Sequence, residues 1–110
     1  MDQSAMSILG RYDFRLFRPG ENDATFTMEG GGVCVIACEH AGTDPGEIRF
    51  SLIWAHKSDE VLQTAKEALQ QNWSQYCRGY LFALLANIDD QGERSQVVFD
   101  LRAHCTKGSA

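Results

Sequence analysis

Two cysteines and a histidine stand close together in residues 34–40, and they have the clearest chemical potential in this chain. Cysteine and histidine are the usual ligands of zinc, so the stretch suggests a metal site. On a β-strand, however, Cys34 and Cys38 would lie ~13 Å apart, too far to share one ion or one disulfide. Cys38 and His40 could chelate together, but no second pair of ligands is placed to complete a site. The sequence therefore predicts no metal and no cofactor, and it makes these cysteines small buried packing residues.

The remaining histidines and thiols do not converge on an active site. His40 and His56 fall at opposite ends of two neighbouring predicted strands, more than ~20 Å apart. Cys77 falls late in a predicted helix, where the helix dipole disfavours a thiolate nucleophile. His56 could join Lys57 and Ser58 in an anion site, although a half-exposed strand end is the simpler interpretation. No histidine has a nearby acid and hydroxyl arranged as in a hydrolase triad, so the sequence favours a protein that is not an enzyme.

Glycine and acidic clusters are interpreted as turns rather than as ligand sites. Glycines 30–32 suggest a phosphate-binding loop, but such loops open a helix, whereas these glycines join two predicted strands. Asp89, Asp90 and Glu93 lack the ligand spacing of a calcium loop. Both clusters are therefore predicted to reverse the chain, and so are residues 43–46, which contain Pro45 and Gly46.

One helix is expected to position the other elements, from Ser58 to Arg78, with Gly79 as its stop. Ser58 is a typical N-cap residue, and Asp59 and Glu60 place negative charge in the first turn. An apolar stripe recurs at steps of three and four residues and gives the helix one buried face: Leu62, Ala65, Leu69, Trp73 and Tyr76.

Strands are predicted on both sides of this helix. Six segments alternate or are continuously apolar, at residues 8–18, 24–29, 33–40, 48–56, 80–88 and 96–105. The expected fold is α+β: a six-stranded, mainly antiparallel sheet, with four strands before the one long helix and two after it, and the helix packed on one face. Residues 8–105 are expected to form a single domain between a flexible lead-in (1–7) and a flexible tail (106–110).

The two faces of this predicted sheet differ in character. The tight turns predict that the first four strands form a meander in which Cys34 lies opposite Trp54. This meander gives a core face under the helix: Tyr12, Phe14, Leu16, Phe26, Met28, Cys34, Ile36, Cys38, Phe50, Leu52 and Trp54. A helix of about 30 Å by 10 Å cannot cover a flat sheet over ~25 Å wide, so either the sheet curls or a partner covers the rest. The other face has an apolar centre and a polar margin, as protein interfaces do. Its members are the candidate partner-binding residues: Arg15, Phe17, Thr27, Val35, Arg49 and Ile53.

Length, charge and cysteine content narrow the class of protein. At 110 residues with a formal net charge of −5, the chain suits one domain and is too acidic for phosphate-backbone binding to be its main role. No apolar run approaches the ~18 residues of a membrane span, and the first residues lack the features of a signal peptide. Four cysteines without a secretory signal indicate free thiols in a reducing compartment, so the expected location is cytoplasmic.

These observations predict a small acidic soluble protein that acts by protein–protein interaction, as an adaptor, regulator or inhibitor of another protein. Docking would use the sheet face that the helix leaves bare, and homodimerisation through the same face is the competing interpretation. The alternative is a small-molecule-binding protein or minor enzyme, with a pocket between a curled sheet and the helix. Tyr12, Trp54, Trp73 and His56 would line that pocket. Nucleic-acid binding by the arginine-bearing face is disfavoured by the acidic total.

Overall fold

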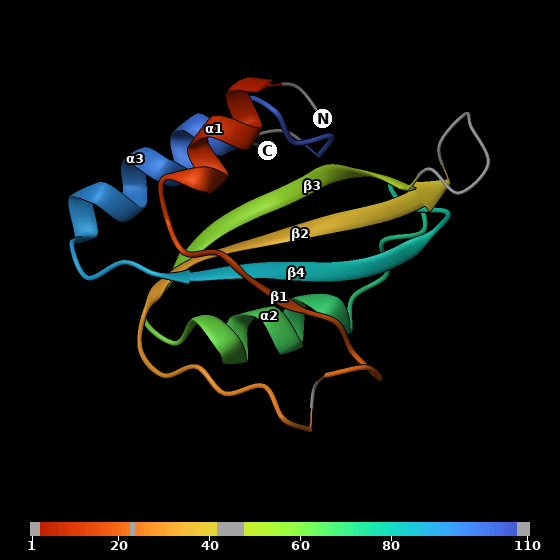
Figure 1. Cartoon of the computed structure of the whole chain (residues 1–110), viewed down its shortest axis with the longest axis horizontal. Helices are drawn as coiled ribbons and strands as arrows, with labels where there is room; N and C mark the ends of the chain where they lie inside the picture. The colour runs from red at the N-terminus through yellow and green to blue at the C-terminus, as the bar shows by residue number, and fades with distance from the viewer. Residues whose placement is uncertain (1–2, 23, 42–47, 108–110) are drawn as a thin grey trace.

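A four-stranded antiparallel sheet and three helices make up the fold, in a computed structural model that describes residues 3–22, 24–41 and 48–107. The elements follow one another as α1 (Gln3–Gly10), β1 (Arg15–Phe17), β2 (Gly32–Ala41), β3 (Ile48–Ser58), α2 (Val61–Leu69), β4 (Tyr80–Asn87) and α3 (Gln91–Arg102). The strand order is β1-β4-β2-β3, so β2 and β4 are central and β1 and β3 form the edges (Figure 1).

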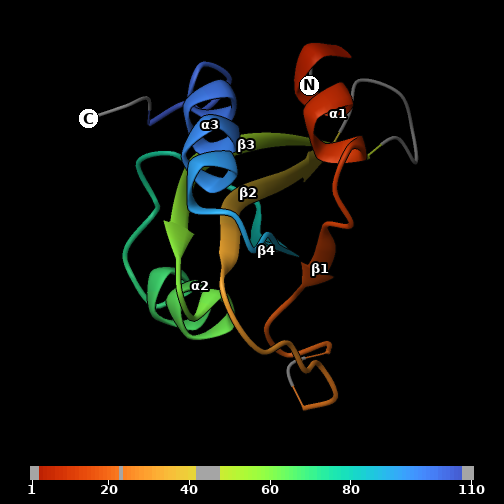
Figure 2. The same ribbon diagram turned by 90° about the vertical axis from the view of Figure 1, so that its left-hand side faces the viewer.

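Helices cover both faces of the sheet. α1 and α3 lie on one face and α2 lies on the other, as the two perpendicular views show (Figures 1 and 2). Two apolar cores result. The α1/α3 core contains Val35 and Leu101, and the α2 core contains Ile36 and Ala65. β2 supplies alternate residues to both cores, which explains why residues 33–38 are all apolar and at most 3% exposed.

A β-bulge in β3 decides which of its residues enter each core. Ile36 of β2 pairs with Trp54. The next residue of β2, Ala37, pairs with Leu52, which leaves Ile53 as the extra residue. Leu52 therefore packs in the α1/α3 core, whereas Ile53 and Trp54 both pack in the α2 core. At Ile53, therefore, the side chains of β3 stop alternating strictly between the two faces of the sheet.

The prediction of six strands and one long helix is wrong, because the described chain has four strands and three short helices. Three of the predicted strands, at residues 33–40, 48–56 and 80–88, are confirmed as β2, β3 and β4. The inference that one sheet face lies bare is also wrong, since α1 and α3 occupy the face opposite α2.

The pairing of β2 with β3 also differs from the predicted register. Cys34 lies opposite His56 rather than opposite Trp54, an offset of two residues that leaves each side chain on its own face. The turn predicted at residues 43–46 lies outside the described residues.

Residues 96–105, predicted as a strand, belong mostly to α3. Val97 and Leu101 fit both periods, because positions four residues apart share a face in a strand and in a helix. Asp90 decides between them: its side chain accepts a hydrogen bond from the Glu93 backbone N–H at 2.7 Å and so caps a helix.

The two predicted strands nearest the N-terminus are largely absent. Residues 8–18 divide between the end of α1 and the short β1, and Ala5 and Ile8, three residues apart, pack as a helical stripe in the α1/α3 core. Residues 24–29 form no strand. Their buried member is Phe26, whose ring meets that of Phe17 edge-on at 5.2 Å.

α2 is shorter than the helix predicted from the apolar stripe, and it ends at Leu69. Trp73 folds back and donates its indole N–H at 2.7 Å to the Ala68 carbonyl at the helix end, which also accepts from the Gln71 backbone N–H at 3.1 Å. At the other end, the Val61 backbone N–H donates to the carbonyl of Gly30 at 3.0 Å. Gly30, the first of the three glycines, therefore helps to cap the N-terminus of α2.

A disulfide joins Cys38 of β2 to Cys77, which lies in the connector between α2 and β4 (residues 70–79). The prediction of four free thiols is wrong for this pair, because the connector crosses the sheet and brings the two Cα atoms to 5.6 Å. Cys34 and Cys105 are free thiols. Burial raises the pKa of Cys34 to about 12, so this thiol stays protonated and unreactive.

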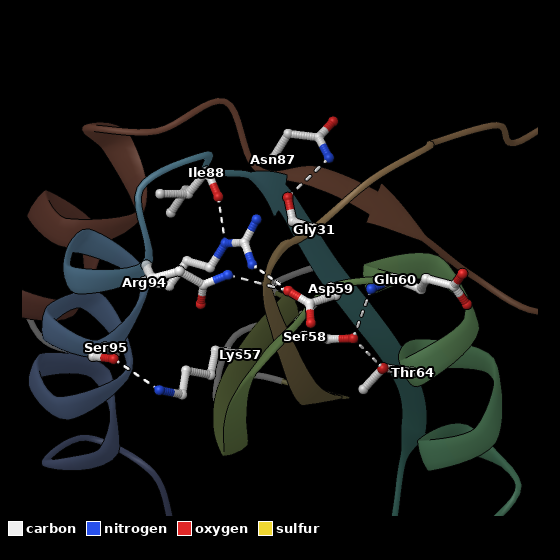
Figure 3. Close-up of polar contacts among 11 residues, drawn as sticks. Gly31, Lys57, Ser58, Asp59, Glu60, Thr64, Asn87, Ile88, Arg94 and Ser95 are labelled. Atoms are coloured by element: carbon white, nitrogen blue, oxygen red, sulfur yellow. Dashed lines mark hydrogen bonds and ion pairs between the residues drawn. The ribbon is translucent and has the colours of Figure 1, made fainter.

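Arg94 of α3 is buried, with 6% of its surface exposed, where several chain connections meet (Figure 3). Its Nε donates to the Ile88 carbonyl, and its Nη1 donates to the Asp59 carboxylate at 2.8 Å. A Cβ added to Gly31 would lie 2.7 Å from the Ser58 backbone oxygen and 2.5 Å from Arg94 Nη2, so a glycine is required beside the guanidinium. Arg94 thus connects the loop between β4 and α3 with the loop between β3 and α2, and it also lies against the glycines before β2.

Replacing Arg94 with methionine should lower the free energy of unfolding by about 1–3 kcal/mol, because the buried Ile88 carbonyl loses its donor. Asp59→Asn should have a much smaller effect, because the Asp59 side chain is 86% exposed and exposed ion pairs contribute little. Urea denaturation of both variants measures the difference. Equal losses would show that the ion pair, and not the buried hydrogen bond, holds this junction.

Removing the disulfide with Cys38→Ala and Cys77→Ala should lower the free energy of unfolding by about 4 kcal/mol, because the bond closes a loop of 39 residues in the unfolded chain. A dithiol reductant should destabilise the wild type by a similar amount. The same reductant should leave the double variant unchanged, and a loss of stability there would contradict the assignment.

Candidate functional site

Three of the six residues predicted to contact a partner are buried in the cores. Val35 is fully buried in the α1/α3 core, whereas Ile53 and Phe17 are buried in the α2 core. They lie on opposite faces of the sheet and leave almost no surface for a partner, since none is more than 2% exposed. The β-bulge at Ile53 is the reason that it does not share a face with Val35.

The other three predicted contact residues are exposed. Arg15 donates to the Thr27 carbonyl at 2.8 Å and lies 4.6 Å over the ring of Phe26, so the structure brings Arg15 and Thr27 together. Arg49 lies on β3, paired with His40 across the sheet, and is separate from them. The structure therefore does not gather the six residues into one surface.

The residues predicted to line a small-molecule pocket lie on opposite sides of the sheet. Trp54 stacks on His56 at 5.1 Å and meets Trp73 at 6.0 Å, in an aromatic cluster on the α2 side of the sheet. Tyr12 packs against the α1/α3 core on the other side. The three clefts described below include none of these four side chains.

An open cleft of about 1360 Å³ lies at one end of the sheet, and we call it the sheet-end cleft. Its lining comes from residues 16, 18–21, 38–40, 51, 76 and 78–81. Tyr80 and Leu16 give it exposed apolar surface, at 76% and 41% exposure. Leu81 is half-buried in the same cleft.

The cleft exists because the neighbouring elements stop short of this end of the sheet. β1 ends at Phe17, opposite Ala83, whereas β4 begins three residues earlier at Tyr80. On the α2 side, the helix ends at Leu69 and an irregular connector continues across the sheet. The start of β4 therefore has no strand on its β1 side within the described part of the chain.

The connector forms one wall of the cleft and is fixed at two points. Trp73 is 4% exposed and packs against Trp54 and Tyr76. The disulfide attaches Cys77 to Cys38, a residue that also lines the cleft. Tyr76 is thereby held at the cleft surface without support from a helix or strand.

Charged side chains form the rim. Arg18 pairs with Glu21 at 3.1 Å and with Glu39, and its guanidinium lies 5.2 Å over the ring of Phe82. His40 and Arg78 make no ion pair with the described residues, so they are available to an incoming group. The cleft thus has an apolar floor and a rim with two unpaired basic side chains.

Two smaller clefts compete with it. One, of about 680 Å³, lies between α1 and α3 and includes Phe99, which is 75% exposed, among mostly polar neighbours. The other, of about 300 Å³, lies beside the start of α2. Neither combines two large exposed apolar side chains.

Potential metal ligands do not cluster in the described residues. Across residues 3–22, 24–41 and 48–107, no three His, Cys, Asp or Glu side chains lie close enough together to hold a metal ion. In the same part of the chain, no helix has both the length and the apolar character needed to span a membrane.

Sequence reasoning missed the sheet-end cleft because its main residue lies in an apolar run. Tyr80 opens the stretch 80–88, which reads as a buried strand throughout, and only the early end of β1 exposes it. The sequence signal that could have located the cleft is Pro19-Gly20, which prevents β1 from continuing along β4.

His56 should titrate below its usual value. Partial burial lowers the pKa of His56, and the positive charges of Arg102 and Lys57 lower it further. The unfolded chain therefore binds the proton more readily, so stability should fall as the pH drops from ~6.5 to the folded-state pKa and then level off. NMR titration of His56, with stability measured against pH, tests this. A His56→Gln variant should lose that part of the pH dependence, and an unchanged profile would contradict the assignment.

Comparisons of the chain with protein-family models, with curated proteins and with solved structures found no match.

Proposed function

We propose that the protein acts by binding another protein, as an adaptor, regulator or inhibitor, and that the sheet-end cleft is its docking surface. The observation that carries the proposal is the exposure of Tyr80 at the mouth of an open apolar cleft. Aromatic side chains are enriched among the residues that dominate binding energy at protein interfaces. A tyrosine left 76% exposed beside Leu16 and Leu81 has the chemistry of such a residue.

The size of the cleft favours a peptide segment over a metabolite. Small-molecule sites are usually enclosed and occupy ~300–1,000 Å³. The sheet-end cleft is larger, at about 1360 Å³, and opens at the end of the sheet. An extended segment of a partner could lie along the start of β4, with one apolar side chain against Tyr80 and the next against Leu81 on the other face of the sheet.

The rim supports the same proposal. Interfaces combine an apolar centre with a polar margin, and here the margin is formed by Arg18, Glu39, His40 and Arg78. Because His40 and Arg78 lack ion-pair partners in the described structure, an acidic residue flanking the apolar anchor would complement them. Of the residues predicted from the sequence, Arg15, Thr27 and Arg49 remain exposed for contacts elsewhere on the surface.

Self-association through the cleft is the competing form of this proposal, since an exposed apolar surface can also bind its own copy. A cytoplasmic location is likewise a proposal. The Cys38–Cys77 disulfide requires an oxidant, so in a reducing compartment it would form only transiently.

Tyr80→Ala should weaken binding of a cleft ligand by about ten-fold or more, because it removes the aromatic anchor. Peptides selected from a displayed random library against the wild type serve as ligands, and fluorescence polarisation gives their Kd. Phe99→Ala is the matched control, because Phe99 is 75% exposed and lies in the cleft between α1 and α3. We expect the control to bind within about two-fold of the wild type.

Several results would contradict this proposal. One is a selection that yields no binder, and another is a Phe99→Ala variant that loses as much affinity as Tyr80→Ala. A wild-type dimer that Tyr80→Ala converts to a monomer in sedimentation experiments would assign the cleft to self-association instead.

A further inference from the structure

Four basic side chains gather along the outer edge of β3, and no described carboxylate pairs with any of them: His56, Lys57, Arg102 and Lys107. We call this group the basic edge. The chain as a whole has 15 Asp and Glu residues against 10 Lys and Arg residues. Acidic groups are therefore plentiful, yet none of those in the described residues neutralises the three cations of this row, Lys57, Arg102 and Lys107.

Neutral groups position two of these side chains. Lys57 Nζ lies 2.9 Å from the Ser95 hydroxyl oxygen (Figure 3). Arg102 Nε donates to the Ala55 carbonyl at 3.3 Å. Both cations are thus held in place while their charge stays uncompensated.

Aromatic rings and the backbone position the other two. His56 stacks on Trp54, with centroids 5.1 Å apart and planes 12° from parallel. Lys107 Nζ lies 5.1 Å from the ring centre of Trp73, and the Lys107 backbone N–H donates to the Ile53 carbonyl at 3.0 Å. The segment after α3 is thereby aligned along β3.

His56, Lys57 and Arg102 lie close enough for their charges to interact. Arg102 and Lys57 both lower the pKa of His56 after burial, which places the three groups in one positive field. Lys57 also interacts electrostatically with the Asp59 carboxylate. That carboxylate, however, already accepts hydrogen bonds from Arg94 and Gln91. A preformed row of cations would lose little conformational freedom when an anion binds.

We propose that the basic edge binds an acidic segment of a partner protein. The row runs beside β3 from Ile53 to Lys57, a span of ~14 Å that matches about four residues of extended peptide. A nucleic acid would extend past this row onto a surface that is acidic overall, which disfavours it. The inference goes beyond the sheet-end cleft, because that cleft includes Ser51 of β3 but none of the four basic residues.

An oligoglutamate peptide with a fluorescent label is the probe, measured by fluorescence polarisation in low-salt buffer at neutral pH. The Lys57→Gln, Lys107→Gln double variant should bind it about five-fold more weakly, because two surface charge contacts are lost. The Arg11→Gln, Lys66→Gln double variant is the control, since it removes the same net charge from two exposed sites, one just after α1 and one on α2. It should change the Kd by less than about two-fold. Arg102 is left intact because it also hydrogen-bonds β3, and thermal melting checks that both variants fold.

Equal losses in the two double variants would overturn the proposal, because only net charge would then matter. Single-stranded DNA that binds more tightly than the peptide, and through the same two lysines, would assign the basic edge to nucleic acid. Self-association that is lost in the Lys57→Gln, Lys107→Gln variant would assign it to a second copy of the chain. A failed selection of cleft peptides would leave this result unaffected, so the two proposals fail separately.

Discussion

The buried guanidinium of Arg94 is the constraint on which the rest of the arrangement depends. A buried guanidinium needs hydrogen-bond partners, since a buried polar group left unsatisfied costs about 1–3 kcal/mol. Arg94 finds them in the Ile88 carbonyl and in Asp59, on links that follow two different strands. The guanidinium also lies against Gly31, and the neighbouring Gly30 carbonyl accepts from the first residue of α2. One side chain of α3 is therefore linked to the start of the helix on the opposite face of the sheet.

Because helices cover both faces, the surfaces left for function are the ends and edges of the sheet. α2 has nine residues and spans only ~14 Å, so it does not reach the end of the sheet. The connector, fixed by Trp73 and the disulfide, covers part of the remainder and leaves the sheet-end cleft. Along the other edge, the segment after α3 occupies the Leu52 and Ile53 carbonyls of β3 and brings Lys107 to the basic edge.

Local pattern was sufficient for β2, β3 and β4, whose apolar runs have few other interpretations. The pattern failed where the helix period and the strand period place the same residues on one face, as at Val97 and Leu101. There, only the N-cap at Asp90 distinguishes a helix from a strand. The bulge at Ile53 and the disulfide between Cys38 and Cys77 depend on tertiary contacts, which the alternation of apolar and polar residues does not reveal. The candidate site was missed for the same reason, because the exposure of Tyr80 depends on where a distant strand stops.

NMR mapping tests most directly whether a partner segment binds at the sheet-end cleft. A peptide selected on the wild type would be titrated into ¹⁵N-labelled protein. We expect the largest changes in amide chemical shift at Leu16, Tyr76, Tyr80 and Leu81, and only a small change at Phe99. Largest changes on α1 and α3, with the start of β4 unmoved, would contradict binding at this cleft.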